Sequence, residues 1–222
     1  MIAFIGTSHA AQHLKEAAIA KGVRVLDDPK QADIVFVSED TPTDERGHRD
    51  LYPIFVLLGE ALDTKKPIVL TSQVPPGFTR EFHVKGVQIY HQAETLRIKD
   101  AKERAAAPDY IAVGCPTYQT YELLPLPYRE YLEAFNCPIH MMTYEDAEFS
   151  KIAVNMTLAA QVENTNRLAE AARLCGATWW HVSKALASDK RIGEHSYLQP
   201  GRWQDSKHLL RDAVTLEGIL AR

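Results

Sequence analysis

The first eleven residues read MIAFIGTSHAA, and this stretch decides the fold. A short apolar run at residues 2–5 leads into Gly6, after which the apolar residues recur with helical spacing. A buried strand that turns tightly into a helix is typical of α/β sheets in which parallel strands alternate with helices. We therefore expect a doubly wound, mostly parallel sheet. Further strands are predicted at residues 23–26, 34–37, 68–70, 87–90 and 110–113, with helices at 9–21 and 51–63.

From residue 143 onward the pattern becomes continuously helical. Residues 144–175 contain neither glycine nor proline, Thr143 is a suitable N-cap, and Gly176 suits the position after the last turn. A helix of about thirty residues is much longer than usual, so we expect it to connect domains or to pack against a second subunit. The stretch 116–127 carries three prolines and is expected to be irregular. Shorter helices are predicted at 179–187 and 206–220.

Composition excludes several classes of protein. The 222 residues include 25 Lys and Arg against 29 Asp and Glu, so the net charge is −4, and nucleic acid is not an expected partner. No apolar stretch is long enough to span a membrane, and the N-terminus lacks the features of a signal peptide. The three cysteines show no C-x-x-C spacing, which favours neither disulfides nor a zinc site. These features predict a soluble, cytoplasmic protein.

The turn after the first strand resembles a dinucleotide-binding motif. Residues 6–11 read G-x-S-x-x-A where that motif has G-x-G-x-x-G. Gly6 supplies the tight turn and Ala11 is small enough for helix–strand packing, whereas Ser8 crowds the approach of a diphosphate but can donate to a phosphate. Asp27 follows about twenty residues later, where a carboxylate binds ribose hydroxyls and favours NAD over NADP. The alternative is an α/β domain with a small-residue turn and a solvated acidic loop.

Two histidines follow one another on the first predicted helix. His9 and His13 are four residues apart and therefore share a helix face. They could hold a metal, but the sequence offers no third ligand nearby, so a solvated helix face is the favoured interpretation. We predict no metal site.

An ordered series of segments runs along the rest of the chain: ADIVFVSEDTPT at 32–43, VLTSQVPPGFTR at 69–80, AETLR at 93–97, PDYIAVG at 108–114, EFSKIAVN at 148–155 and SDKRIG at 188–193. Together they resemble the motifs of the UDP-glucose/GDP-mannose dehydrogenase family over nearly the whole sequence. The resemblance implies a Rossmann dinucleotide-binding domain at residues 1–142 and a helical dimerisation and substrate region at 143–222. It also implies NAD as cofactor, a sugar nucleotide as substrate and a homodimer.

The resemblance also implies a set of site residues. Lys151 and Asn155 are four apart, so they project from one helix face, where an ammonium can stabilise a substrate oxygen and an amide can orient it. A solvated helix face is the alternative. Glu94 and Asp212 occupy the family's acid–base glutamate and substrate-site aspartate positions. The expected cofactor-binding residues are Gly6, Ser8, His9, Ala11, Asp27, Thr41 and Ser72.

Several positions depart from the family pattern. Residues 201–212 read GRWQDSKHLLRD where the family has G-x-G-x-G-G-S-C-F-P-K-D, so His208 replaces the nucleophilic cysteine. Without a thiolate the thioester route to a carboxylate is not expected. His208 can instead act as a general base, or be an exposed helix residue. Gln73 and Ile98 replace a family threonine and glutamate. In the family a second α/β domain follows the position of Arg222.

Three functions remain open at this point. The first is an NAD-dependent oxidoreductase that acts on the CH–OH group of a sugar nucleotide or sugar-like substrate in one two-electron step. The second is a non-catalytic, homodimeric NAD- or nucleotide-binding module of the same descent. The third is reduction of a small hydroxy acid on the same scaffold.

Overall fold

The computed structural model describes residues 1–222 except 83–85, 94–95 and 97. The described chain forms two compact units that are not contiguous in sequence. Unit 1 comprises residues 1–42 and 50–151, and unit 2 comprises residues 43–49 and 152–222. No helix within the described ranges is both long enough and apolar enough to cross a membrane.

Unit 1 is built on one sheet, which among the described residues has seven strands in the order β2-β1-β3-β4-β5-β6-β7. All neighbouring strands are parallel except β5 and β6, which are antiparallel. This confirms the expected Rossmann-type, mostly parallel sheet. The strands are β1 (Ile2–Ile5), β2 (Val25–Leu26), β3 (Ile34–Val37), β4 (Ile68–Leu70), β5 (Ile89–Ala93), β6 (Ile111–Cys115) and β7 (Ile139–Thr143).

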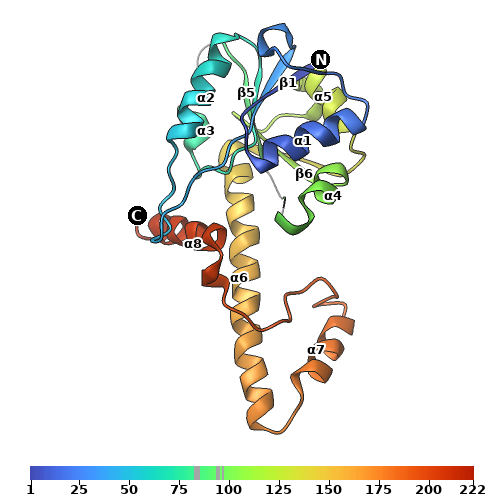
Figure 1. The fold of residues 1–222 in the computed structure, drawn as a ribbon, viewed down its shortest axis with the longest axis vertical. Helices are drawn as coiled ribbons and strands as arrows, with labels where there is room; N and C mark the ends of the chain where they lie inside the picture. Colours follow the sequence, from blue (N-terminus) through green and yellow to red (C-terminus); the bar gives the residue numbers. More distant parts are fainter. Residues whose placement is uncertain (83–85, 94–95, 97) are drawn as a thin grey trace. The chain divides into compact units, whose positions relative to one another are not determined.

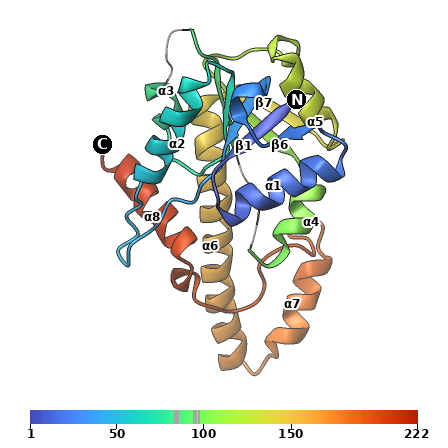
Figure 2. The same ribbon diagram turned by 45° about the horizontal axis from the view of Figure 1, so that its top comes forward.

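Helices cover both faces of this sheet (Figures 1 and 2). Side chains alternate along a strand, and in β3 Phe36 packs toward one face while Val35 and Val37 pack toward the other. The Phe36 face is covered by α1 (His9–Ala20), α4 (Ala101–Ala106) and α5 (Leu126–Glu133). The opposite face is covered by α2 (Tyr52–Asp63) and α3 (Phe78–Glu81).

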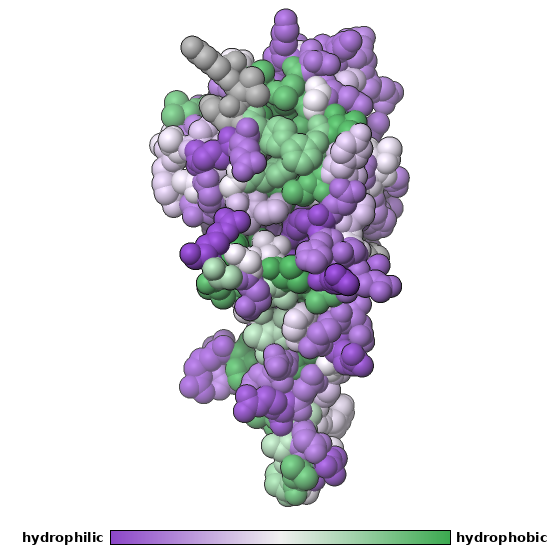
Figure 3. Space-filling model, turned by 90° about the vertical axis from the view of Figure 1, so that its left-hand side faces the viewer, coloured by the Kyte–Doolittle hydropathy of each residue, from purple (hydrophilic) through white to green (hydrophobic). Residues whose placement is uncertain are grey.

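The outer side of α2 carries exposed apolar side chains. Tyr52, Phe55 and Val56 are 71%, 45% and 43% exposed. Figure 3 faces the side on which α2 lies in Figure 1, and it shows hydrophobic residues gathered within a polar surround there. Phe55 also contacts Phe78 and Phe82, with ring centroids 5.4 and 5.2 Å away, so part of this apolar surface packs on the second core cluster.

The long helix α6 (Tyr144–Leu174) begins and ends where the sequence predicted. Thr143 Oγ1 accepts a hydrogen bond from the amide of Asp146 at 3.3 Å, and the Asp146 carboxylate accepts from the amide of Thr143 at 3.2 Å. This reciprocal pair is a capping box. Gly176, with φ of +79°, follows the last turn in the left-handed conformation that glycine tolerates best. The helix is continuous between Lys151, the last residue of unit 1, and Ile152 of unit 2.

Unit 2 contains the rest of α6 together with α7 (Trp179–Ser188) and α8 (Lys207–Leu220). The connection after α7 is tied to α6 by Thr165 Oγ1, which donates to the carbonyl of Tyr197 at 2.8 Å, and by Asn166, which exchanges two hydrogen bonds with Gly201. Segment 43–49 packs against α8, because a Cβ on Gly47 would lie 2.7 Å from Val214 Cγ2. Single turns of 3₁₀ helix occur at Pro29–Gln31, Ile98–Asp100, Tyr121–Leu123 and Trp203–Asp205.

The structure also differs from the sequence-based expectations. Strand β7 and helices α3, α4 and α5 were not predicted. The stretch 116–127, expected to be irregular, holds a 3₁₀ turn and the start of α5, because Pro127 lies in the first turn where its missing N–H is not needed. The strands predicted at 87–90 and 110–113 are displaced toward the C-terminus, to Ile89–Ala93 and Ile111–Cys115.

Candidate functional site

The turn between β1 and α1 admits only glycine at its first position. Gly6 has φ of +119°, and a Cβ there would lie 2.0 Å from the carbonyl oxygen of Ser38 at the end of β3. Ser8 is the N-cap of α1: its Oγ accepts from the amide of Ala11 at 3.1 Å and donates to the Ser38 carbonyl at 3.2 Å. The Ser8 hydroxyl, which we expected to donate to a phosphate, therefore joins this turn to the end of the neighbouring strand.

A carboxylate that the sequence analysis did not single out lies against this turn. One oxygen of Glu39 accepts from the backbone amide of Thr7 at 2.7 Å and from Thr7 Oγ1 at 3.2 Å. The other oxygen accepts from the amide of Asp40 at 3.0 Å. The amide of Glu39 itself donates to Ser72 Oγ at 2.8 Å, so Ser72, an expected cofactor residue, positions the backbone of Glu39. The only signal in the sequence is an acid two residues after the third apolar strand.

Two other expected cofactor residues lie at the same edge of the sheet. Asp27 directly follows β2, its side chain is 97% exposed, and it accepts from Lys15 Nζ at 3.0 Å. Thr41 is buried, and its Oγ1 donates to the carbonyl of Gln73 at 3.4 Å. The Asp27 carboxylate is thus accessible, whereas the Thr41 hydroxyl takes part in a loop contact.

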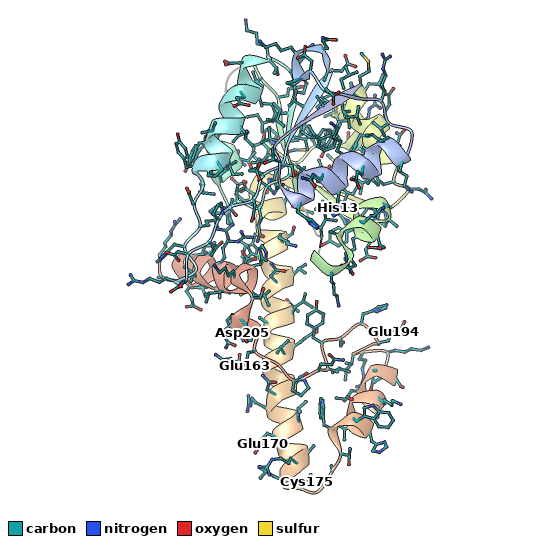
Figure 4. The ribbon with its side chains drawn as sticks, in the orientation of Figure 1. His13, Glu163, Glu170, Cys175, Glu194 and Asp205 are labelled. Atoms are coloured by element: carbon teal, nitrogen blue, oxygen red, sulfur yellow. The ribbon has the colours of Figure 1, made fainter. Side chains whose placement is uncertain are left out.

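The histidine pair on α1 is close but isolated. His9 and His13 have their Nε2 atoms 3.0 Å apart, and Figure 4 marks His13 on this helix. Glu16 Oε2 lies 3.8 Å from His13 Nδ1. In the part of the chain that the structure describes, no group of three His, Cys, Asp or Glu side chains is arranged to hold a metal ion.

Two of the motif segments meet in unit 1 at Glu148. This side chain of α6 is 1% exposed, and its two oxygens accept from the amides of Gly77 at 2.6 Å and Thr79 at 2.7 Å. Burial raises the pKa of Glu148 to about 7, although the two amides favour its charged form. Nearby, Arg80 forms an ion pair with Glu145. The 69–80 and 148–155 segments are therefore joined through one buried carboxylate.

A buried polar cluster in unit 2 joins α6, α8 and segment 43–49. Asn155 Nδ2 donates to Asp212 Oδ2 at 2.6 Å. Arg49 Nη2 donates to Asp212 Oδ1 at 2.9 Å and to Thr215 Oγ1 at 3.0 Å. Arg211 Nε lies 3.9 Å from the same carboxylate, and the Arg49, Arg211 and Asp212 side chains are 6%, 3% and 0% exposed. Two of the predicted reacting residues, Asn155 and Asp212, are thus brought together, and Arg49 is a partner that the sequence analysis missed.

The electrostatics of the cluster keep Arg49 charged. Its burial, assisted by the neighbouring charge of Arg211, lowers its pKa to about 10, while Asp212 opposes this change. A pKa of about 10 still leaves the guanidinium protonated at neutral pH. Asp212 therefore lies between a cation and an amide donor, both within hydrogen-bond distance.

Residues 145–217 match the central domain of the UDP-glucose/GDP-mannose dehydrogenase family. Over this stretch the chain is similar to these dehydrogenases. It is 28% identical over 201 residues to a UDP-glucose 6-dehydrogenase of Pseudomonas aeruginosa, covering 84% of this chain and 43% of that one. It is 29% identical over 186 residues to the UDP-glucose 6-dehydrogenase AglM of Haloferax volcanii, covering 75% and 43%. The chain thus spans less than half the length of these curated relatives.

Solved structures of several dehydrogenases share the fold. A UDP-glucose dehydrogenase from Pyrobaculum islandicum superposes with a TM-score of 0.74 at 19% identity, over 98% of this chain and 64% of that one. A 3-hydroxyisobutyrate dehydrogenase from Mycobacterium tuberculosis superposes with a TM-score of 0.66 at 16% identity, over 98% and 87%. At these identities the structures support the fold alone.

The segment matching the dehydrogenase family contains four of the predicted reacting residues. Lys151 is half-buried and lies one helical turn before Asn155 on α6. His208, at the family's cysteine position, is exposed on α8. Glu94, the fifth predicted reacting residue, lies outside the described residues.

The three cysteines lie in other elements. Cys115 ends β6 and is buried, which raises the pKa of its thiol to about 11, and Cys137 is half-buried. Cys175 is exposed and directly follows α6, as Figure 4 shows. No thiol belongs to α8, so the structure offers no substitute for the family's cysteine within that helix.

Proposed function

We propose that the chain binds NAD(H) and acts as an oxidoreductase on the CH–OH group of a sugar nucleotide or a sugar-like substrate. The observation that carries this proposal is the buried contact between Asn155 and Asp212. These residues are 57 positions apart, lie inside the segment that matches the dehydrogenase family, and approach to 2.6 Å. The relatives named as UDP-glucose 6-dehydrogenases favour a sugar nucleotide as the substrate class.

The β1–α1 turn has features that suit a dinucleotide. Gly6 allows a close approach of backbone at the start of α1, and helix N-termini favour negative charge. His9 and Ala10 lie in the first turn of α1, where backbone amides have no partner within the helix and can donate to a phosphate. The exposed carboxylate of Asp27 suits ribose hydroxyls. Bound NAD would supply the hydride acceptor or donor.

Residues of the chain would stabilise the substrate oxygen, orient the substrate and accept its proton. The Lys151 ammonium would stabilise the negative charge that develops on the substrate oxygen. Asp212 holds the amide of Asn155 in one orientation, so Asn155 would present a fixed group to the substrate. His208 would accept the proton that leaves the substrate hydroxyl. Because no thiolate stands at position 208, the reaction would stop at the carbonyl after one hydride.

The test is NADH formation with a panel of sugar nucleotides and small alcohols. Lys151→Ala should lower kcat by about a hundredfold or more, because a charge that stabilises the developing oxyanion is lost. Lys102→Ala, an exposed lysine on α4, is the matched control and should leave kcat unchanged. His208→Ala should lower kcat less, and in a pH-dependent way. A carboxylate product from the wild-type protein would contradict the single-step assignment.

A second candidate function is a nucleotide-binding module without catalysis. It is favoured by the exposure of His208 and by the engagement of Asp212 with Arg49. Under this alternative, calorimetry would detect NAD binding while no substrate in the panel gave turnover. Turnover by the wild type that is lost in Lys151→Ala would exclude it.

We also propose that the protein forms a homodimer through α6. This helix exposes large apolar side chains along its length, and exposed apolar area of this kind marks interfaces. Sedimentation equilibrium at micromolar concentration should show a dimer, and a monomer would contradict the proposal. The residues are Phe149, Val154, Leu168 and Leu174, which are 40%, 39%, 41% and 71% exposed.

A further inference from the structure

The turn expected to receive a diphosphate already binds a carboxylate of its own chain. Glu39 accepts from the Thr7 amide at 2.7 Å, and its Oε2 lies 3.5 Å from the position that a Cβ on Gly6 would take. We propose that Glu39 is an internal competitor for the phosphate-binding turn, so that NAD(H) binds only when this carboxylate leaves. The inference rests on the proposed NAD binding.

The contact has the chemistry of the ligand it would exclude. A carboxylate oxygen that accepts a backbone N–H at 2.7 Å forms a charge-assisted hydrogen bond, as a phosphate oxygen does at the start of a helix. An N–H can serve one such acceptor well at a time, so Glu39 and a diphosphate oxygen compete for the Thr7 amide. The second contact, from Thr7 Oγ1 at 3.2 Å to the same oxygen, gives Glu39 an advantage over solvent water.

Hydrogen bonds hold both the backbone and the carboxylate of Glu39. Its amide donates to Ser72 Oγ at 2.8 Å, and the preceding carbonyl, that of Ser38, accepts from Ser8 Oγ at 3.2 Å. Its other carboxylate oxygen accepts from the amide of Asp40 at 3.0 Å. The side chain is therefore presented to the turn by a fixed strand end, and only rotation about its own side-chain bonds can remove it.

Repulsion between like charges makes the competition stronger than steric exclusion alone would. A dinucleotide diphosphate is anionic, so a ligand that reached the turn while Glu39 remained would meet a like charge within a few ångströms. Since NAD(H) can bind only the fraction of molecules from which Glu39 has withdrawn, the apparent affinity falls by that fraction. Glu39 would thereby determine the NAD(H) concentration that is needed to occupy the site.

The experiment compares NAD(H) binding by calorimetry in the wild type, Glu39→Ala, Glu39→Gln and Asp40→Asn. Glu39→Ala should tighten binding by about tenfold or more. Glu39→Gln keeps an acceptor but loses the charge, and should fall between the two. Asp40→Asn removes the same charge from the next residue, which is exposed, and should change affinity less than about threefold. Equal affinity in the wild type and Glu39→Ala, or weaker binding by Glu39→Ala, would overturn the proposal.

A second probe separates this inference from the proposed function. Inorganic pyrophosphate is titrated into the wild type and Glu39→Ala while the amide resonance of Thr7 is followed by NMR. If no variant binds NAD(H) but pyrophosphate binds Glu39→Ala about tenfold more tightly and shifts the Thr7 resonance, the proposed function fails and the competition stands. If pyrophosphate binds both proteins equally, the competition fails.

Discussion

The buried ion pair between Arg49 and Asp212 allows a direct test of what holds unit 2 together. Their atoms are 2.9 Å apart, and the two side chains are 6% and 0% exposed, so water screens the pair little. Removing one partner of a buried, hydrogen-bonded pair costs about 3–5 kcal/mol, because the remaining charge stays in a poorly solvated site. We expect Asp212→Asn to lower the free energy of unfolding by about 3 kcal/mol or more. For a protein of this length, that corresponds to a fall of roughly 6–12 °C in Tm.

The assay is denaturant unfolding of the two single variants and the double variant. Arg49→Met should cost less than Asp212→Asn, because Asp212 would keep the Asn155 amide and the nearby Arg211. The double variant should be more stable than the sum of the single losses predicts, which measures the coupling. Arg191→Met is the control, since its pair with Asp189 is exposed, and it should change stability little. A coupling energy near zero would refute the reasoning.

Three further predictions concern unit 1. Since burial raises the pKa of Glu148 to about 7 from an ordinary value of 4.5, the native state alone binds a proton between these pH values. The wild type should therefore lose stability relative to Glu148→Gln as pH rises from about 5 to 8, and a constant difference in urea unfolding would contradict this. NAD should bind about tenfold or more tightly than NADP because Asp27 repels the added phosphate, and calorimetry that shows equal binding would count against it. Gly6→Ala should lower the stability by more than the roughly 1–2 kcal/mol of left-handed backbone strain, because its Cβ would overlap Ser38. Gly22→Ala is the control: no atom lies near its Cβ, so it should lower the stability by that strain alone. Thermal melting of both variants measures the difference.

Much of the framework could be predicted because its signals are local. The strands at Ile2–Ile5 and Ile34–Val37 are unbroken apolar runs, and buried parallel strands need little else. Helix α6 was predicted end to end because its caps and its lack of glycine and proline are visible in the sequence. Strand β7 was missed because it pairs on one side only, is mostly half-buried and reads IHMMT, with few β-branched residues.

Only the candidate site residues that lie in family motifs could be predicted from the sequence. Asn155 and Asp212 were predicted from motif positions, and in the structure they are joined by a hydrogen bond. Arg49 could not be predicted, since its partner is 163 residues away and an arginine in a polar loop usually faces solvent. Glu39 was missed for a similar reason: its contact depends on the parallel pairing that sets the end of β3 beside the turn after β1.

Segment 43–49 gives the folding of unit 2 an unusual order. The ribosome makes Arg49, which lies between β3 and α2, 163 residues before its carboxylate partner Asp212. The sheet-forming residues up to 143 can assemble first, whereas segment 43–49 completes its contacts only after α8 has been made. Contacts between residues so far apart in the sequence form slowly. Unit 2 should therefore be the last part of the molecule to form, and residues 152–222 expressed alone would lack the arginine that completes their interior.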